Sequence, residues 1–175
     1  MLIDTSYFVD GDLLIEGLSD GLSSPMATAL TADVERYIDV HGRDYLYKLL
    51  GDDVARNFIS YYEDSILTRP TMDANEAYDA LIGQLVRYHD TERRSPMASY
   101  VYYWYVRDHQ LRATGIGVTY ANSDNRVVKP ITLLTRVWNR MVDMNRSIVK
   151  DVLVANGVEF VCQKELLEQI NTLGI

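Results

Sequence analysis

The spacing of apolar residues becomes helical at about residue 31. From Thr31 to Gly51 apolar side chains form one broad stripe, with Thr31 placed to cap the helix and Gly51 placed to end it. A long helical pattern also begins at Pro130 and runs to about residue 155. Between these two, helical patterns bounded by turn or capping residues cover 52–67, 73–89 and 95–110. The sequence therefore predicts about five helices.

The first thirty residues do not share this period. Asp10-Gly11 stands between two apolar runs, which indicates a hairpin or a turned extended segment. This N-terminal segment has little to pack against locally. We expect it to lie on the helical body or on a neighbouring subunit.

A second non-helical stretch, residues 113–130, separates the last two long helices. Residues 115–120 alternate as in a strand, a polar turn follows, and residues 126–129 form a return strand that ends at Pro130. We therefore predict a mainly α fold: a bundle of about five helices with an inserted β-hairpin and an extended N-terminal segment. The chain forms a single domain, 1–175, with these parts: 1–30 extended or hairpin, 31–112 helices, 113–130 β-hairpin, 131–155 long helix and 156–175 C-terminal tail.

The stretch Tyr100–Val106, "YVYYWYV", holds seven bulky residues in a row. It is far shorter than the roughly 20 apolar residues that a membrane span needs. The preceding Ser95-Pro96 is a strong helix start, which favours a helix over a strand. Successive helical residues point about 100° apart, so bulky side chains point in every direction and the whole helix must be buried. We expect one side to fill the core and some of its tyrosines to lie at a neighbouring subunit.

Charge is unevenly distributed along the chain, whose net charge is -8. Residues 1–86 contain 16 acidic and 5 basic side chains, residues 87–150 contain 5 acidic and 11 basic, and residues 151–175 contain 4 acidic and 1 basic. Three interpretations remain open. The pattern reflects chance and solvated faces, or acidic and basic surfaces that meet on neighbouring copies in a head-to-tail ring. The third interpretation is a basic patch that binds nucleic acid, although an acidic chain repels phosphate at long range.

Residues suited to catalysis are scattered. The three histidines, His41, His89 and His109, do not form a ligand pair at helical spacing, so the sequence favours neither a metal site nor a cofactor. The single cysteine, Cys162, excludes an internal disulfide and is expected to be a buried structural thiol. The start of the chain lacks the basic and apolar regions of a secretory signal. We predict a protein that is not an enzyme and is kept in a cytoplasm-like compartment.

Several segments together resemble a known family. They are "RYIDVHGRDYLYKLLG", "SPMASYVYYWYVRDHQ" followed by "TGIGV", and "NRVVKPITLLTRVWNRM", in this order over roughly residues 31–145. The chain resembles the head–tail connector (adaptor) proteins of tailed bacteriophages, of the type found in phages of Bacteroidetes. The resemblance implies a structural virion protein of the neck, made in the host bacterial cytoplasm. It implies a ring, commonly of twelve copies, beneath the portal protein, and no membrane contact.

In such a ring the chain extends the channel through which double-stranded DNA passes without sequence-specific binding, and it offers a platform for tail or further neck proteins. The candidate subunit interface consists of Tyr100, Tyr102, Tyr103, Tyr105, Gly115, Gly117, Asn125 and Arg126. The candidate basic contact face consists of Arg136, Arg140, Arg146 and Lys150. The alternative is a DNA-binding packaging or regulatory protein that uses the basic helix 131–150. A third candidate, an enzyme of unknown reaction, has only scattered histidines and acids to support it.

Overall fold

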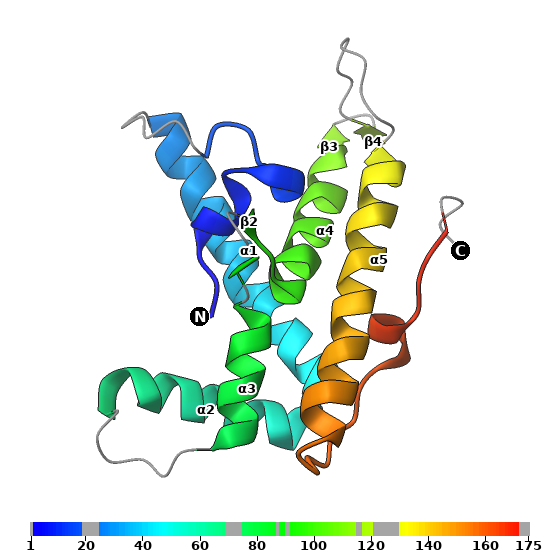
Figure 1. The fold of residues 1–175 in the computed structure, drawn as a ribbon. Coiled ribbons are helices and arrows are strands. Elements are labelled where there is room, and N and C mark those ends of the chain that lie inside the picture. The colour runs from blue at the N-terminus through cyan, green and yellow to red at the C-terminus, as the bar shows by residue number, and fades with distance from the viewer. Residues whose placement is uncertain are drawn as a thin grey trace.

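The fold of the chain is mainly helical, as predicted, and it was analysed as a computed structural model (Figure 1). The structure describes residues 2–18, 25–68, 75–86, 88–89, 92–114, 117–120 and 130–171. Within them lie five α-helices: α1 (Pro25–Leu50), α2 (Asp52–Thr68), α3 (Glu76–Leu85), α4 (Pro96–Gln110) and α5 (Pro130–Ile148). A π-helical turn, η3 (Val149–Val154), continues α5.

Three long helices build the core. The helix α4 packs against both α1 and α5, while α2 and α3 lie together at one end of the molecule (Figure 1). The fully buried side chains come from all of these elements and include Tyr45, Leu49, Phe58, Leu81, Tyr100 and Met141. A single apolar cluster therefore joins the described helices.

The two ends of α1 show where sequence signals succeed and fail. Gly51 ends the helix as predicted, with the positive φ of 78° that glycine adopts readily. The helix begins at Pro25, however, six residues before Thr31. The Thr31 hydroxyl donates to the carbonyl of Ala27 at 2.9 Å, so this side chain lies within the helix and does not cap it. A proline at the first position of a helix costs nothing, which explains the earlier start.

The N-terminal segment, predicted as a hairpin or a turned extended segment, forms no paired strands within residues 2–18, although it does lie on the helical body. Two short 3-10 helices, η1 (Thr5–Phe8) and η2 (Gly11–Leu13), replace the paired strands. The apolar side chains of this segment are buried against the helices: Leu2, Ile3, Tyr7, Phe8, Leu13 and Ile15. The segment gains more by burying these side chains on the helical body than by pairing with itself, since an isolated two-stranded hairpin is only marginally stable.

The β-hairpin predicted over residues 113–130 is not seen in its predicted form. The strand β3 (Leu111–Thr114) pairs antiparallel with β4 (Gly117–Tyr120), with Leu111 opposite Tyr120 and Thr114 opposite Gly117. Residues 117–120 thus pair with residues 111–114, of which 111–112 were predicted to belong to the helical section and 113–114 to the start of the hairpin. The predicted return strand, 126–129, lies outside the described residues.

The helix predicted over residues 73–89 is shorter than expected. It runs only from Glu76 to Leu85, capped by the Asn75 side chain, which accepts from the amide of Tyr78 at 3.1 Å. Two short strands follow, β1 (Tyr88–His89) and β2 (Glu92–Arg93), which pair antiparallel. Asn is among the preferred capping residues, and here it takes the place expected for Asp73.

The last described residues return along α5 (Figure 1). This C-terminal segment, residues 158–171, contains one 3-10 helix, η4 (Lys164–Leu167), and otherwise extended chain. Its amides also reach α1: Val161 donates to the carbonyl of Leu50 at 3.3 Å, and Gln163 donates to that of Lys48 at 2.8 Å. The segment thereby satisfies carbonyl groups that the end of α1 leaves without a helical partner.

Candidate functional site

The aromatic helix α4 is buried by its own chain. Ser95 caps it as predicted, with its hydroxyl accepting from the amide of Ala98 at 3.2 Å. Tyr100, Tyr102 and Tyr105 are all buried in the core, and Tyr103 is half-buried. The burial of these tyrosines therefore needs no second subunit. Of the four, Tyr103 has the exposure that a contact with another copy requires.

Tyr100 lies at the centre of an aromatic cluster. Its ring packs against Tyr45 at 5.6 Å, Trp138 at 6.1 Å and Trp104 at 6.2 Å between ring centroids. Aromatic pairs at these separations contribute stability beyond the area they bury. This cluster joins α1, α4 and α5, which explains the run of aromatic residues as a feature of the core.

The Tyr100 hydroxyl forms hydrogen bonds with charged side chains. It donates to Asp44 Oδ2 at 2.6 Å and accepts from Lys48 Nζ at 2.9 Å. Lys48 Nζ also lies 2.9 Å from Glu165 Oε1 of the C-terminal segment. Partial burial lowers the pKa of Lys48, but the hydrogen bonds to Tyr100 and Glu165 outweigh this effect and hold that pKa above its usual range. The lysine stays charged and links α1 to the C-terminal segment.

Alkaline pH is expected to weaken the fold through Tyr100. Burial, together with the hydrogen bond to Asp44, raises the pKa of Tyr100 from its ordinary value of 10.0 to about 12. A raised folded-state pKa gives stability that is present below pH 10 and is lost as the pH rises through 12. We expect the free energy of unfolding, measured with urea, to fall less steeply over this window in Tyr100→Phe than in the unmodified chain. Equal slopes in the two proteins would contradict the prediction.

Two of the histidines have structural partners. The His41 ring stacks on Tyr37 at 5.2 Å and on Trp104 at 5.6 Å, and burial lowers its pKa. His109 lies 2.9 Å from Asp33 through Nε2 and 2.7 Å from the Tyr105 carbonyl through Nδ1. These contacts join α1 to α4. The structure does not describe the side chain of His89.

Neither the single cysteine nor any described cluster of polar side chains points to a reactive site. Burial raises the pKa of the Cys162 thiol to about 11, so the thiol is protonated at neutral pH and is a weak nucleophile. Cys162 is half-buried, less than the fully buried thiol that the sequence led us to expect. Among the described residues, no three His, Cys, Asp or Glu side chains come together in a way that could hold a metal ion.

The candidate basic contact face of α5 is largely engaged within the chain. Arg136 Nη2 lies 3.3 Å from Asp12 Oδ1, and Arg140 Nη2 lies 2.5 Å from Asp12 Oδ2. Arg146 donates to the carbonyl of Leu167 through Nε at 3.0 Å and Nη2 at 2.8 Å. Lys150 is exposed on the π-helical turn. The structure thus brings an acidic residue of the N-terminal segment to two of the four predicted bases.

Sequence reasoning missed the polar contacts between α5 and the C-terminal segment. Asn145 is fully buried: its Oδ1 accepts from the Tyr45 hydroxyl at 2.6 Å and its Nδ2 donates to the Leu166 carbonyl at 2.9 Å. Asn139 both donates to the carbonyl of Ile170 and accepts from its amide. One signal was available, because Asn145 falls on the apolar stripe of its helix between Met141 and Ile148.

The other predicted interface residues fall partly outside the structure. Gly117 is the first residue of β4, and Gly115, Asn125 and Arg126 lie outside the described residues. The interface therefore stays a prediction at these positions. Within the described part of the chain, no helix combines the length and the apolar character needed to cross a membrane.

The chain was also compared with known proteins. It matches no protein-family model, no curated protein and no solved structure. What the residues themselves establish is a mainly helical fold, with an aromatic core around Tyr100 and a basic helix face that holds Asp12.

Proposed function

We propose that this chain is a structural connector protein of a tailed bacteriophage, which forms a ring beneath the portal and extends the DNA channel. The proposal rests on the family resemblance of residues 31–145 and on one observation, a groove suited to contact with another protein. It assigns no catalytic residue and no cofactor. The proposed partners are copies of the same chain, the portal protein, and tail or further neck proteins.

The groove lies between the α1–α2 corner and the C-terminal segment and has a volume of about 640 Å³. Its apolar lining includes Tyr47, Val54, Phe160 and Val161, and Val161 is 75% exposed. Three carboxylates line the same groove: Asp52, Asp53 and Glu159. An exposed apolar surface with a charged rim is typical of a protein–protein contact. Its negative charge suits the basic side chains of a second copy.

The ring proposal predicts a discrete native mass. We expect the purified chain, alone or mixed with portal assemblies, to form one oligomer whose mass is a fixed multiple of 20.0 kDa, measured by native mass spectrometry. Val161→Asp should reduce the oligomer fraction, because it places a charge in the apolar contact. The matched control is Val40→Asp, since Val40 is also exposed, at 57%, and lies on α1 away from the groove lining. A chain that stays monomeric with and without portal assemblies would contradict the proposal.

The alternative, a DNA-binding protein that uses α5, has less support in the arrangement of charges. Asp12 pairs with Arg136 and Arg140, and the Leu167 carbonyl accepts from Arg146. Among the described side chains, Lys150 is the one of the four proposed bases that makes no ion pair or hydrogen bond of this kind. We therefore rank the connector first.

A further inference from the structure

Two arginines on α5 hold one carboxylate between them. Arg136 and Arg140 are one helical turn apart, so they lie on the same face of α5, and each guanidinium contacts a different oxygen of Asp12. Guanidinium groups bind carboxylates and phosphates with the same planar geometry. The Asp12 carboxylate therefore occupies a position in which a phosphate group would find two donors.

Asp12 is held in this position by its neighbours along the chain. Gly11 has a φ of 65°, which turns the chain so that η2 can begin. Leu13 and Ile15 are buried on the helical body, and the Tyr102 hydroxyl contacts the Leu14 carbonyl at 3.5 Å. The N-terminal segment thus stays in place through apolar contacts that do not depend on the Asp12 charge.

The ion pairs themselves are exposed to solvent. The side chains of Arg136, Arg140 and Asp12 are 59%, 39% and 36% exposed. Ion pairs with this exposure add little to stability and are screened by salt. An incoming anion can therefore replace Asp12 without unfolding the N-terminal segment.

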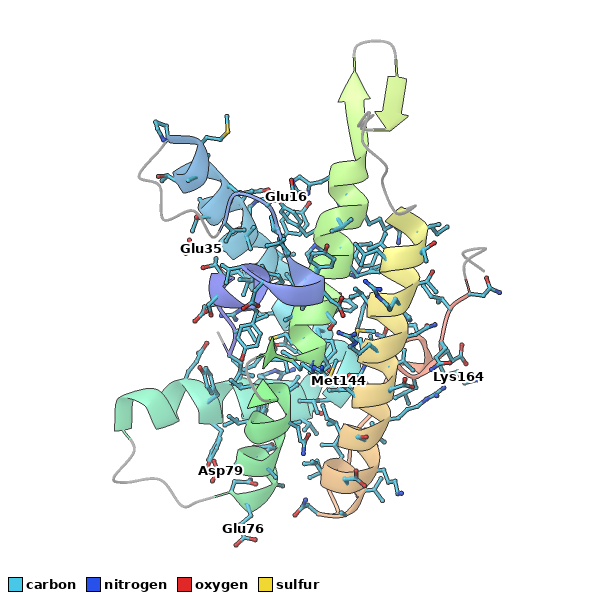
Figure 2. All side chains as sticks on the ribbon, turned by 45° about the horizontal axis from the view of Figure 1, so that its top comes forward. Glu16, Glu35, Glu76, Asp79, Met144 and Lys164 are labelled. Atoms are coloured by element: carbon cyan, nitrogen blue, oxygen red, sulfur yellow. The ribbon has the colours of Figure 1, made fainter. Side chains whose placement is uncertain are left out.

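A cavity beside Arg140 offers more polar groups. It has a volume of about 310 Å³ and is lined by Gln84, Arg94, Arg140, Asp143, Met144, Ser147 and Ile148. A second, smaller cavity is lined by Arg94 and Arg140 together with Asp10, Asp12, Ser95 and Ser99. Met144, labelled in Figure 2, marks the side of α5 that faces this region. The Asp143 carboxylate repels an anion in this cavity, but it also accepts a hydrogen bond from Gln169 Nε2 at 2.9 Å and lies 3.8 Å from Arg146 Nη1.

We propose that Arg136 and Arg140 form a phosphate-binding site for the backbone of duplex nucleic acid, and that Asp12 masks this site from within the chain. The net charge of -8 repels a polyanion at long range, so the masked protein binds it weakly. Removal of the Asp12 charge frees two guanidiniums for phosphate contacts. This proposal does not depend on ring formation.

The test compares two substitutions that change the net charge equally. Asp12→Asn removes the masking carboxylate, whereas Asp39→Asn removes an exposed carboxylate on α1 that does not line either cavity beside Arg140. Binding to a labelled random-sequence DNA duplex at low salt is measured by fluorescence anisotropy. We expect Asp12→Asn to bind about fivefold more tightly than Asp39→Asn. The salt dependence of log K should steepen by about 1.8, as expected for two additional phosphate contacts.

Two further arms identify the site and the recognised group. Adding Arg136→Gln and Arg140→Gln to Asp12→Asn should abolish the gain in DNA affinity. Excess tripolyphosphate should also abolish this gain, because it competes with DNA for the two arginines. Circular dichroism on each variant confirms that the helical fold is kept. The proposal is overturned if Asp12→Asn binds no more tightly than Asp39→Asn, if the gain survives the loss of both arginines, or if it survives saturating tripolyphosphate.

Discussion

Tyr100→Ala is expected to lower the free energy of unfolding by about 4 kcal/mol, the range found when a buried aromatic ring is removed from a core. The Tyr100 ring is fully buried and contacts the aromatic rings of Tyr45, Trp104 and Trp138. The substitution therefore leaves a cavity where α1, α4 and α5 meet. It also removes the hydroxyl that bridges Asp44 and Lys48.

Urea denaturation followed by circular dichroism measures this loss, with Tyr103→Ala as the matched control. Tyr103 lies on the same helix but is only half-buried, so we expect its truncation to cost clearly less. If the two substitutions cost the same, the assignment of Tyr100 to the core would be wrong. A further comparison with Tyr100→Phe separates the ring from the hydroxyl, whose hydrogen bonds we expect to account for about 1 kcal/mol.

Asn145→Ala should be the next most damaging change, at about 3 kcal/mol. The substitution leaves the buried Tyr45 hydroxyl without its acceptor and the Leu166 carbonyl without its donor. Each buried polar group that loses its partner costs about 1–3 kcal/mol. The effect should therefore exceed that of truncating an exposed asparagine or glutamine, for which Gln169→Ala is the control.

A double-mutant cycle with Tyr45→Phe tests the cause. If the Tyr45 hydroxyl accounts for part of the loss, Asn145→Ala should cost less in the Tyr45→Phe protein than in the unmodified chain, because no hydroxyl then remains unpaired. Additive losses would show that the two side chains do not depend on each other. The thermal midpoint of each variant gives an independent measure of the same order of effects.

The sequence predicts the helices well because their signals are local. The Ser95 cap, Gly51 at the end of α1 and the apolar stripe of α5 all act within a few residues, and the structure confirms each of them. The extents of the elements are less predictable. Pro25 and Thr31 both carry local signals for a helix start, and the sequence pattern alone does not say that α1 uses Pro25.

The burial of α4 shows the limit of reasoning from one helix. The helical step implies burial on every side of "YVYYWYV", but in the structure Tyr103, Trp104 and Val106 are only half-buried, and the step does not say what covers each side. Here the N-terminal segment covers part of the helix, as the contact between the Tyr102 hydroxyl and Leu14 shows, while α1 and α5 pack against other sides. A second subunit is therefore not needed for Tyr100, Tyr102 or Tyr105.

The uneven charge distribution has a similar explanation. An acidic residue of the first half meets basic residues of the second half within one chain, as Asp12 does with Arg136 and Arg140. Part of the segregation along the sequence is thus cancelled in space. A pairing between distant residues of this kind cannot be derived from the charge count of either half.

The return of the C-terminal segment also determines when this chain can finish folding during its synthesis. A ribosome releases α1 first, yet the carbonyls of Lys48 and Leu50 receive their donors from Gln163 and Val161, and Tyr45 waits for Asn145, 100 residues later. Contacts so distant in sequence form late, after the loop between them has closed. The nascent chain therefore leaves the Tyr45 hydroxyl and the last carbonyls of α1 without these partners until residues 145–163 have been made, and a product that stops before Leu166 lacks the carbonyl to which Asn145 Nδ2 donates.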